Sequence, residues 1–424
     1  MDTTAPIETP QEKAQDPFDR LLAPVLFLGA AVIYNAILAM LNAHVMHVSQ
    51  GTVIVAEGII VLGAVAYLMT KLSLVRNCPE VLLFQLAMLV IFLGVTLLSE
   101  FLNVKAFRDI FLITVFFLLG TMTSRKRIIQ VFTILTILTL FFLLMEAYAT
   151  DAYAGLFNPA SYYANTRGLT NPDFNDSGIF VNALSFEGRF TLGILNVSHR
   201  LSSLFIEQVS LGNFAIILSV FLSLLWKDMT WRSRVVLVGT IFLILATNNS
   251  RTAILLSLLI FIGHIIFPKL PRFTHMIYLP LTLIAVVTWF DIPQCINEST
   301  GRPFLLSDDI QGRLGLSACS LRSLTYENLL GFKSDFATPF WDSGFVYFIN
   351  SESLLGLIVF WLFCSLAIKP ATENGIRVNH YLALAIFINM FTSMALFSIK
   401  VSGPLWFIAG YVYMQQKNRE LKST

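Results

Sequence analysis

The sequence predicts an all-α polytopic integral membrane protein with about twelve transmembrane helices and two long external loops. Of its 424 residues, 56% are apolar and only 13% are charged, which is far from the balance of a soluble globular protein. That share is about 237 apolar residues, and a helix needs roughly 20 of them to cross about 30 Å of hydrocarbon. The 28 basic and 26 acidic residues leave a net charge of +2 and no basic tract, which excludes nucleic-acid binding.

The chain opens with a polar, proline-containing segment over residues 1–20, which we expect to be a disordered cytoplasmic tail. It lacks the basic start and cleavage site of a secretory signal, so the first apolar run is expected to remain as a span. A single transmembrane domain over 21–414 and a second cytoplasmic tail over 415–424 follow. The expected spans are Leu21–Met40, Val53–Met69, Val81–Leu98, Asp109–Met122, Ile128–Tyr148, Val209–Trp226, Val235–Ala246, Thr252–Ile266, Met276–Phe290, Phe345–Ile368, Tyr381–Ser398 and Val401–Met414.

The distribution of Lys and Arg predicts that both termini are cytoplasmic, because cytoplasmic loops collect these residues. This orientation leaves two long connections outside, from Ala149 to Gln208 and from Asp291 to Gly344, while the others are short. Long connections between packed elements are usually functional or disordered. The first contains many Tyr and Phe residues, more than a solvated linker carries. We therefore expect both loops to fold over the external helix ends, where aromatic faces suit either sugar rings or ordinary packing.

Arginines in the external segments suggest an anion site. A guanidinium donates two parallel hydrogen bonds to phosphate oxygens and stays charged at any pH, so clustered arginines suit a diphosphate. The alternative is that each is a solvated loop charge or an interfacial anchor. The residues are Arg167, Arg189 and Arg200 in the first loop, Arg251 in the short connection NNSRTA, and Arg302, Arg313 and Arg322 in the second loop.

The stretch HRLSSLFIEQV, from His199 to Val209, is the sharpest local feature. If it is helical, Arg200 and Glu207 share one face, as do Ser203 and Glu207. Ionisable groups at the edge of a membrane are costly and tend to mark pathways or active sites. A carboxylate or His near the arginines is a candidate general base for an acceptor hydroxyl. The alternative is a salt bridge that locks the helix end.

Four stretches together resemble the O-antigen polymerase and ligase superfamily, which comprises Wzy-type polysaccharide polymerases and the O-antigen ligases of lipopolysaccharide. They are RLSSLFIEQVSLGNF from Arg200, NNSRTAILL around Arg251, LRSLTYENLLGF from Leu321 and WDSGFVYFINSESLLGLIVF from Trp341. The resemblance covers roughly Arg200 to Phe360. It also extends to the arrangement of about twelve spans with enlarged third and fifth external loops.

The resemblance implies a glycosyltransferase that moves glycan from an undecaprenyl-diphosphate-linked donor to an acceptor sugar hydroxyl. The reaction would take place at the periplasmic face of the bacterial inner membrane, without a cofactor or metal. The implied partners are the bilayer, a chain-length co-polymerase and a flippase. The catalytic candidates are Arg200, Glu207 and His199. The candidates for binding diphosphate or glycan are Arg167, Arg189, Arg251, Arg313, Arg322 and Asp342, where either Arg313 or Arg322 matches the second-loop Arg of the family.

Departures from the family favour a polymerase over a ligase. Ligases carry a His in the late external loop, and residues 291–344 contain none. Polymerases often have an Arg followed, after ten intervening residues, by a Gly. Arg167 and Gly178 have this spacing. A transporter or lipid flippase is the alternative from another class, but we find no internal repeat and the charges gather outside the predicted spans. Lipid-dependent glycosyltransferases of the other common membrane fold typically need an acid in the first external loop, and LNAHVMHVSQGT has none.

Two of the four cysteines, Cys295 and Cys319, share the second long loop. An oxidising compartment allows them to pair, but spacing alone leaves open whether they do. His44 and His47 in the first external loop have no Cys or carboxylate beside them. We therefore expect no metal site.

Overall fold

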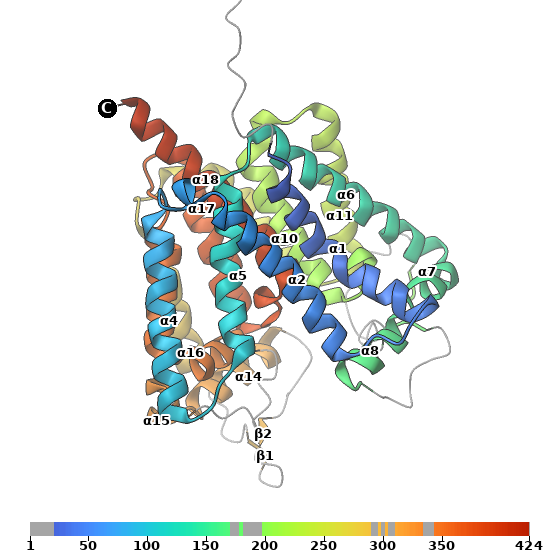
Figure 1. Cartoon of the computed structure of the whole chain (residues 1–424), viewed down its shortest axis with the longest axis horizontal. Helices are drawn as coiled ribbons and strands as arrows, with labels where there is room; N and C mark the ends of the chain where they lie inside the picture. The colour runs from blue at the N-terminus through green and yellow to red at the C-terminus, as the bar shows by residue number, and fades with distance from the viewer. Residues whose placement is uncertain are drawn as a thin grey trace, which may run out of the picture.

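The computed structural model describes residues 21–169, 178–180, 197–289, 296–297, 302–303, 310–333 and 343–423, so the predicted tail at 1–20 lies outside the described residues. The described residues fold as helices, with one antiparallel pair of two-residue strands among them, β1 (Ile296–Asn297) and β2 (Arg302–Pro303). Figure 1 shows α8 (Pro159–Arg167), α14 (Ile310–Arg322) and α15 (Tyr326–Leu330) toward the same end of the bundle as these strands. We call this the loop end; the carboxyl terminus lies at the opposite end.

Eight of the described helices are long and apolar enough to cross a membrane. They confirm the predicted class, an all-α multi-pass membrane protein, and their outward faces carry many exposed Leu, Ile and Val side chains. The total of about twelve spans stays a prediction. The eight helices are α1 (Ala23–His44), α2 (Gln50–Met69), α4 (Pro79–Ser99), α6 (Arg125–Tyr148), α10 (Gln208–Leu225), α11 (Trp231–Asn248), α12 (Arg251–Ile266) and α16 (Gly344–Leu366).

The other four predicted spans fall on helices that are charged, short or interrupted. α5 (Val104–Thr121) has charged residues in its first turns, and α13 (Tyr278–Trp289) has only 12 residues. α17 (Glu373–Ala383) passes into a π-turn over Leu384–Ile388 and then short 3₁₀ turns, so Tyr381–Ser398 is not one straight helix. α18 (Ile399–Ser423) includes residues 415–423, predicted as a tail, because QQKNRELK contains no helix breaker.

The remaining short elements connect these helices. α7 (Thr150–Phe157) and α8 belong to the first long loop and pack on α1, where Tyr162 donates to Asn35 Oδ1 at 2.5 Å and Ser161 lies 3.2 Å from Asn42 Nδ2. The described part of this loop therefore covers one end of the bundle. The other short elements are α3 (Leu72–Val75) and 3₁₀ turns at Ser203–Phe205, Trp226–Asp228, Phe267–Lys269, Thr274–Ile277, Asn389–Phe391 and Ala395–Phe397.

Two helices pack backbone to backbone in the core. α5 is buried along most of its length, and α18 lies directly against it. A Cβ atom at Gly120 would overlap the carbonyl oxygen of Phe407, and one at Gly410 would overlap that of Phe117. Glycine is required at both positions, because small residues allow close approach of helices.

The predicted span Phe345–Ile368 is divided. Ser353 has φ of 66° and ψ of 172°, which breaks α16 into two helices. A Cβ at Gly344, the first residue of α16, would lie 2.9 Å from the carbonyl oxygen of Ser393. The first half of α16 therefore begins against the chain segment that follows the π-turn.

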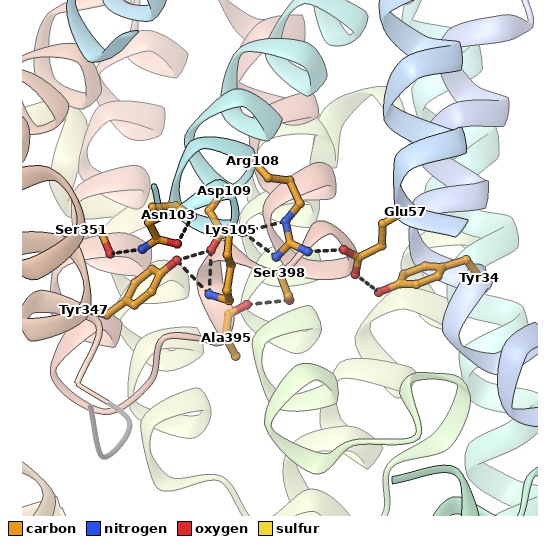
Figure 2. A network of polar contacts seen from close by, with 11 residues as sticks. Tyr34, Glu57, Asn103, Lys105, Arg108, Asp109, Tyr347, Ser351, Ala395 and Ser398 are labelled. Atoms are coloured by element: carbon orange, nitrogen blue, oxygen red, sulfur yellow. Dashed lines mark hydrogen bonds and ion pairs between the residues drawn. The ribbon is translucent and has the colours of Figure 1, made fainter. Parts of the chain in front are cut away.

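A network of charged and tyrosine side chains joins α1, α2, α5 and α16 (Figure 2). Tyr34 donates to Glu57 Oε1 at 2.6 Å, and Glu57 pairs with Arg108. Arg108 donates to Asp109 Oδ1 at 2.7 Å, and Tyr347 donates to Asp109 Oδ2 at 2.7 Å. The expectation that charges gather outside the spans fails at Glu57, which is buried within the candidate span α2, and Asp109 is buried in α5. Mutual pairing offsets the cost of placing these charges between helices.

We expect Asp109→Asn to lower the free energy of unfolding by about 2 kcal/mol, between the values for buried and exposed pairs. The carboxylate also accepts from Lys105 at 3.0 Å, so the substitution removes the carboxylate partner of Lys105 and one of the two carboxylate partners of Arg108. Thermal unfolding of the detergent-solubilised protein measures the loss. Asp228→Asn, which breaks the exposed pair with Arg125, is the control. Equal unfolding temperatures for Asp109→Asn and wild type would contradict a stabilising network.

Candidate functional site

A cavity of about 80 Å³ lies at the loop end, where α10 and α12 begin. Its walls come from both of these helices, from the segment before α10, from α14 and from the segment after the π-turn. The lining residues are Arg200, Val209, Gly212, Asn213, Ile216, Ser250, Arg251, Thr252, Ala253, Arg313, Asn389, Thr392 and Ser393.

Three arginines from separate segments line this cavity. Arg200 precedes α10, Arg251 is the first residue of α12, and Arg313 lies on α14. The lining residues include no Asp, Glu or His among the described part of the chain, so the described wall carries three positive charges and no negative one. Three of the arginines that the sequence predicted as an anion clamp therefore meet at one place.

The structure also separates the two second-loop arginines. Arg313 lines the cavity, whereas Arg322 is exposed and its Nε donates to the carbonyl oxygen of Val287 on α13 at 2.9 Å. Of these two candidates, Arg313 is the one placed to contact an anion in the cavity.

Helix amino termini add to the positive potential. The first N–H groups of an α-helix have no partner within the helix, and the macrodipole places partial positive charge there. α12 begins in the cavity wall, where its N-cap residue Ser250 accepts from the N–H of Ala253 at 3.4 Å. α10 contributes Val209 from its first turn. Helix amino termini and arginine side chains together form a typical site for phosphate oxygens.

Gly212 leaves room in the cavity wall. A Cβ at this position would lie 3.2 Å from Asn248 Oδ1 and 3.2 Å from Ser250 Cβ. Asn389 donates to Asn213 Oδ1 across the cavity wall, and Thr252 Oγ1 lies 3.4 Å from Thr392 Oγ1. These contacts hold the segment after the π-turn against α10 and α12. A larger residue at Gly212 therefore crowds Ser250 in the cavity wall without changing the charge of the lining.

The segment that carries Arg200 is not the helix that the sequence suggested. Ser203 and Ile206 have φ of 51° and 61°, and only a 3₁₀ turn spans 203–205. Arg200 and Glu207 do not share a helical face. Arg200 Nε instead donates to the carbonyl oxygen of Asn248 at 2.9 Å. The expectation is wrong because contacts with other helices override the local preference for helix.

Glu207 lies in an ion triad rather than in the cavity wall. Its carboxylate is 2.9 Å from Arg167 Nη1 and 2.9 Å from Lys400 Nζ, and it accepts from Ser210 Oγ at 2.7 Å. Burial by itself raises the pKa of Glu207, but Lys400 and Arg167 outweigh it and hold the pKa well below its ordinary value. A carboxylate with so low a proton affinity is a weak general base.

Arg167 belongs to the same triad. Its guanidinium lies over the Tyr163 ring, 4.5 Å from the centroid, and Glu207 is its partner. Although burial lowers the pKa of Arg167, the Glu207 carboxylate raises it above the ordinary value. Arg167 therefore anchors α8 to the start of α10 and is not among the described residues that line the cavity.

His199 is also outside the cavity wall. It is buried, and its Nε2 lies 3.4 Å from Glu146 Oε1. The remaining two predicted site residues, Arg189 and Asp342, lie outside the described residues. Within the described part of the chain, no group of three or more His, Cys, Asp or Glu side chains is arranged to hold a metal ion.

The comparisons with known proteins add no assignment. No family model, no curated protein and no solved structure matches the chain. The resemblance to the O-antigen polymerase and ligase superfamily therefore stays a prediction from the sequence.

Several residues that build the site gave no clear signal in the sequence. In the sequence, Glu146 lies at the end of an apolar run, and Lys400 lies between two predicted spans. Asn248 donates to the carbonyl oxygens of Leu201 and Gln208 at 2.9 and 2.8 Å, which joins α11 to the segment of Arg200. The NNSRTA connection, which contains Asn248, did stand out in the sequence, but only because it contains Arg251.

Cys319 on α14 is disulfide-bonded, whereas Cys295 lies outside the described residues. Cys78 and Cys364 are free and buried. We expect a Cys78→Ser/Cys364→Ser variant, denatured in SDS, to react with maleimide only after reduction, and then at both remaining cysteines. Denaturation removes burial as the reason for protection. Labelling without reductant would contradict a disulfide in the mature protein.

Proposed function

We propose that this chain is a membrane glycosyltransferase, a polysaccharide polymerase that transfers glycan from an undecaprenyl-diphosphate-linked donor to an acceptor sugar hydroxyl. One observation carries the proposal: Arg200, Arg251 and Arg313 line one cavity at the amino termini of α10 and α12. Such a cavity suits the phosphate groups of a lipid diphosphate, and its three arginines are among the residues that the sequence resemblance implies for donor binding or catalysis.

The proposed chemistry uses these groups in the transition state. The bond between the sugar carbon and the diphosphate oxygen breaks while the acceptor oxygen forms a bond to the same carbon. The leaving diphosphate gains negative charge, which preorganised guanidinium and N–H donors stabilise. The acceptor hydroxyl loses a proton to a base, and no carboxylate or imidazole among the described lining residues is placed to take it. We therefore assign no base.

The size of the cavity suggests what it encloses. At about 80 Å³ it is well below the 300–1,000 Å³ of typical small-molecule sites. It suits phosphoryl oxygens, and the glycan then extends beyond it over the loop end. We propose that the loop end is periplasmic, that both termini are cytoplasmic, and that the membrane is the bacterial inner membrane. A flippase then supplies the donor, and a co-polymerase sets the chain length.

A deletion strain tests this proposal. Without the protein, cells should carry lipid-linked single repeats on the outer side of the membrane and no long polymer. An O-antigen ligase, the runner-up, would instead leave long lipid-linked polymer that never reaches its final acceptor. Gel analysis of lipid-linked and surface glycans separates the two outcomes, and long undelivered polymer would overturn the polymerase proposal.

A transporter of lipid or polysaccharide is a second candidate, favoured by two observations. Glu57 and Asp109 are buried among the helices, and α16 is broken at Ser353. Transporters often combine intramembrane charges with interrupted helices. In that case the deletion strain should trap single repeats on the cytoplasmic face, where a periplasmic glycosidase cannot reach them.

A further inference from the structure

The backbone that places Arg200 in the cavity is strained. Ser203 and Ile206 both have positive φ, a conformation that non-glycine residues rarely adopt. Such residues persist only where the surrounding structure holds them, and they cluster at functional sites. The segment has only a 3₁₀ turn of its own. Contacts from other helices must therefore fix it.

One carboxylate accepts three hydrogen bonds from this segment. Glu146, in the last turn of α6, is fully buried. Its Oε2 accepts from the N–H groups of Ser202 and Ser203 at 2.8 and 2.6 Å. Its Oε1 accepts from Ser202 Oγ at 3.1 Å and lies 3.4 Å from His199 Nε2. Glu146 thus holds the chain after Arg200 with charge-assisted hydrogen bonds, which are stronger than neutral ones, and lies close to His199 just before it.

Hydrogen bonds with two other residues also hold the segment that carries Arg200. Tyr153 donates to the carbonyl oxygen of Ser203 at 2.7 Å, and its hydroxyl lies 3.0 Å from Ser202 Oγ. On the other side, the carbonyl oxygen of Asn248 accepts from Arg200 Nε at 2.9 Å. The guanidinium is therefore held by its Nε, while its backbone is held by Glu146.

We propose that Glu146 is a positioning residue that fixes Arg200 for binding phosphate oxygens in the cavity. A fully buried carboxylate at the end of a membrane helix is costly and tends to mark a functional site. The inference rests on the proposed function, because it assigns a task within the proposed diphosphate site. Glu146 does not itself line the cavity, so it acts through Arg200.

Binding of inorganic pyrophosphate to the purified full chain in nanodiscs tests this role. We measure the Kd by calorimetry for wild type, Glu146→Gln, Arg200→Ala and the double variant. Glu146→Gln should weaken binding about tenfold or more. The double variant should bind no more weakly than Arg200→Ala alone, because residues that act through one another are not additive. Glu57→Gln, which breaks a buried pair away from the cavity, should lower the unfolding temperature and leave the Kd unchanged.

The outcomes separate the inference from the proposed function. Wild-type binding that is lost in Arg200→Ala but kept in Glu146→Gln overturns the inference alone, as do losses that multiply in the double variant. Absence of binding in wild type overturns the diphosphate site, and the inference with it. If Glu146→Gln does not fold, Ser202→Ala removes one donor to the carboxylate and should weaken binding severalfold. A wild-type Kd in Ser202→Ala then overturns the inference.

Discussion

Arg251→Ala is expected to slow glycan transfer by about 10²–10³-fold while the protein remains at its normal level in the membrane. Removing one donor that stabilises charge in a transition state typically has this cost. Within the described residues, the Arg251 side chain makes no hydrogen bond or ion pair and lines the cavity, so its loss should spare the fold. Arg200→Ala should have a similar effect on transfer. Arg200→Lys should restore little, because an ammonium cannot reproduce the paired donors of a guanidinium.

Arg322→Ala is the matched control for these variants. It removes an arginine from the same long loop as Arg313, but one that donates to Val287 rather than lining the cavity. Polymer length and amount on gels report transfer, and immunoblots of membranes report abundance. Normal polymer from both Arg200→Ala and Arg251→Ala, or equal loss in Arg322→Ala, would contradict the assignment of the cavity.

Glu207→Gln is expected to lower the free energy of unfolding by about 3 kcal/mol at neutral pH, because it leaves Lys400 buried without its partner. The side chains of Glu207 and Lys400 are only 14% and 4% exposed. Since the pKa of Glu207 is lowered on folding, its stabilising effect is fully present above the ordinary value of 4.5. The effect is then lost as the pH falls below that value toward the folded pKa.

Thermal unfolding in detergent at neutral pH and at about pH 4 checks this dependence. The difference in unfolding temperature between wild type and Glu207→Gln should be large at neutral pH and should become smaller on acidification. Glu420→Gln, which breaks an exposed pair with Lys369, should change stability by less than about 0.5 kcal/mol. A gap that widens as the pH falls would contradict the triad. The folded Glu207→Gln variant should still transfer glycan, because the Glu207 carboxylate belongs to the ion triad and not to the cavity wall.

The helices could be predicted from the sequence because membrane spans depend on composition alone. α1, α2, α4 and α6 each follow an apolar run, and no contact with another segment is needed to find them. Interruptions were not predictable in this way. Ser353 and the π-turn at Leu384–Ile388 lie inside apolar runs, and their conformations depend on packing against other segments.

The candidate site was predictable in its residue types and not in its contacts. External arginines pointed to an anion site, and Arg200, Arg251 and Arg313 do line one cavity. The partners of Glu207 were missed, because Arg167 is 40 residues away and Lys400 is 193 residues away in the chain. Spacing rules apply within one helix and carry no information about such distant pairs.

The most direct test is transfer by the purified protein. Wild type, Arg251→Ala and Gly212→Val are reconstituted in nanodiscs with a donor that carries one repeat unit on undecaprenyl diphosphate, in the presence of EDTA. Gly212→Val crowds Ser250 in the cavity wall without changing the charge of the lining, since even a Cβ there is 3.2 Å from Ser250 Cβ. We expect a ladder of lipid-linked polymer from wild type and none from either variant. A wild-type reaction without polymer, or a full ladder from both variants, would contradict a polymerase that binds its donor diphosphate in this cavity.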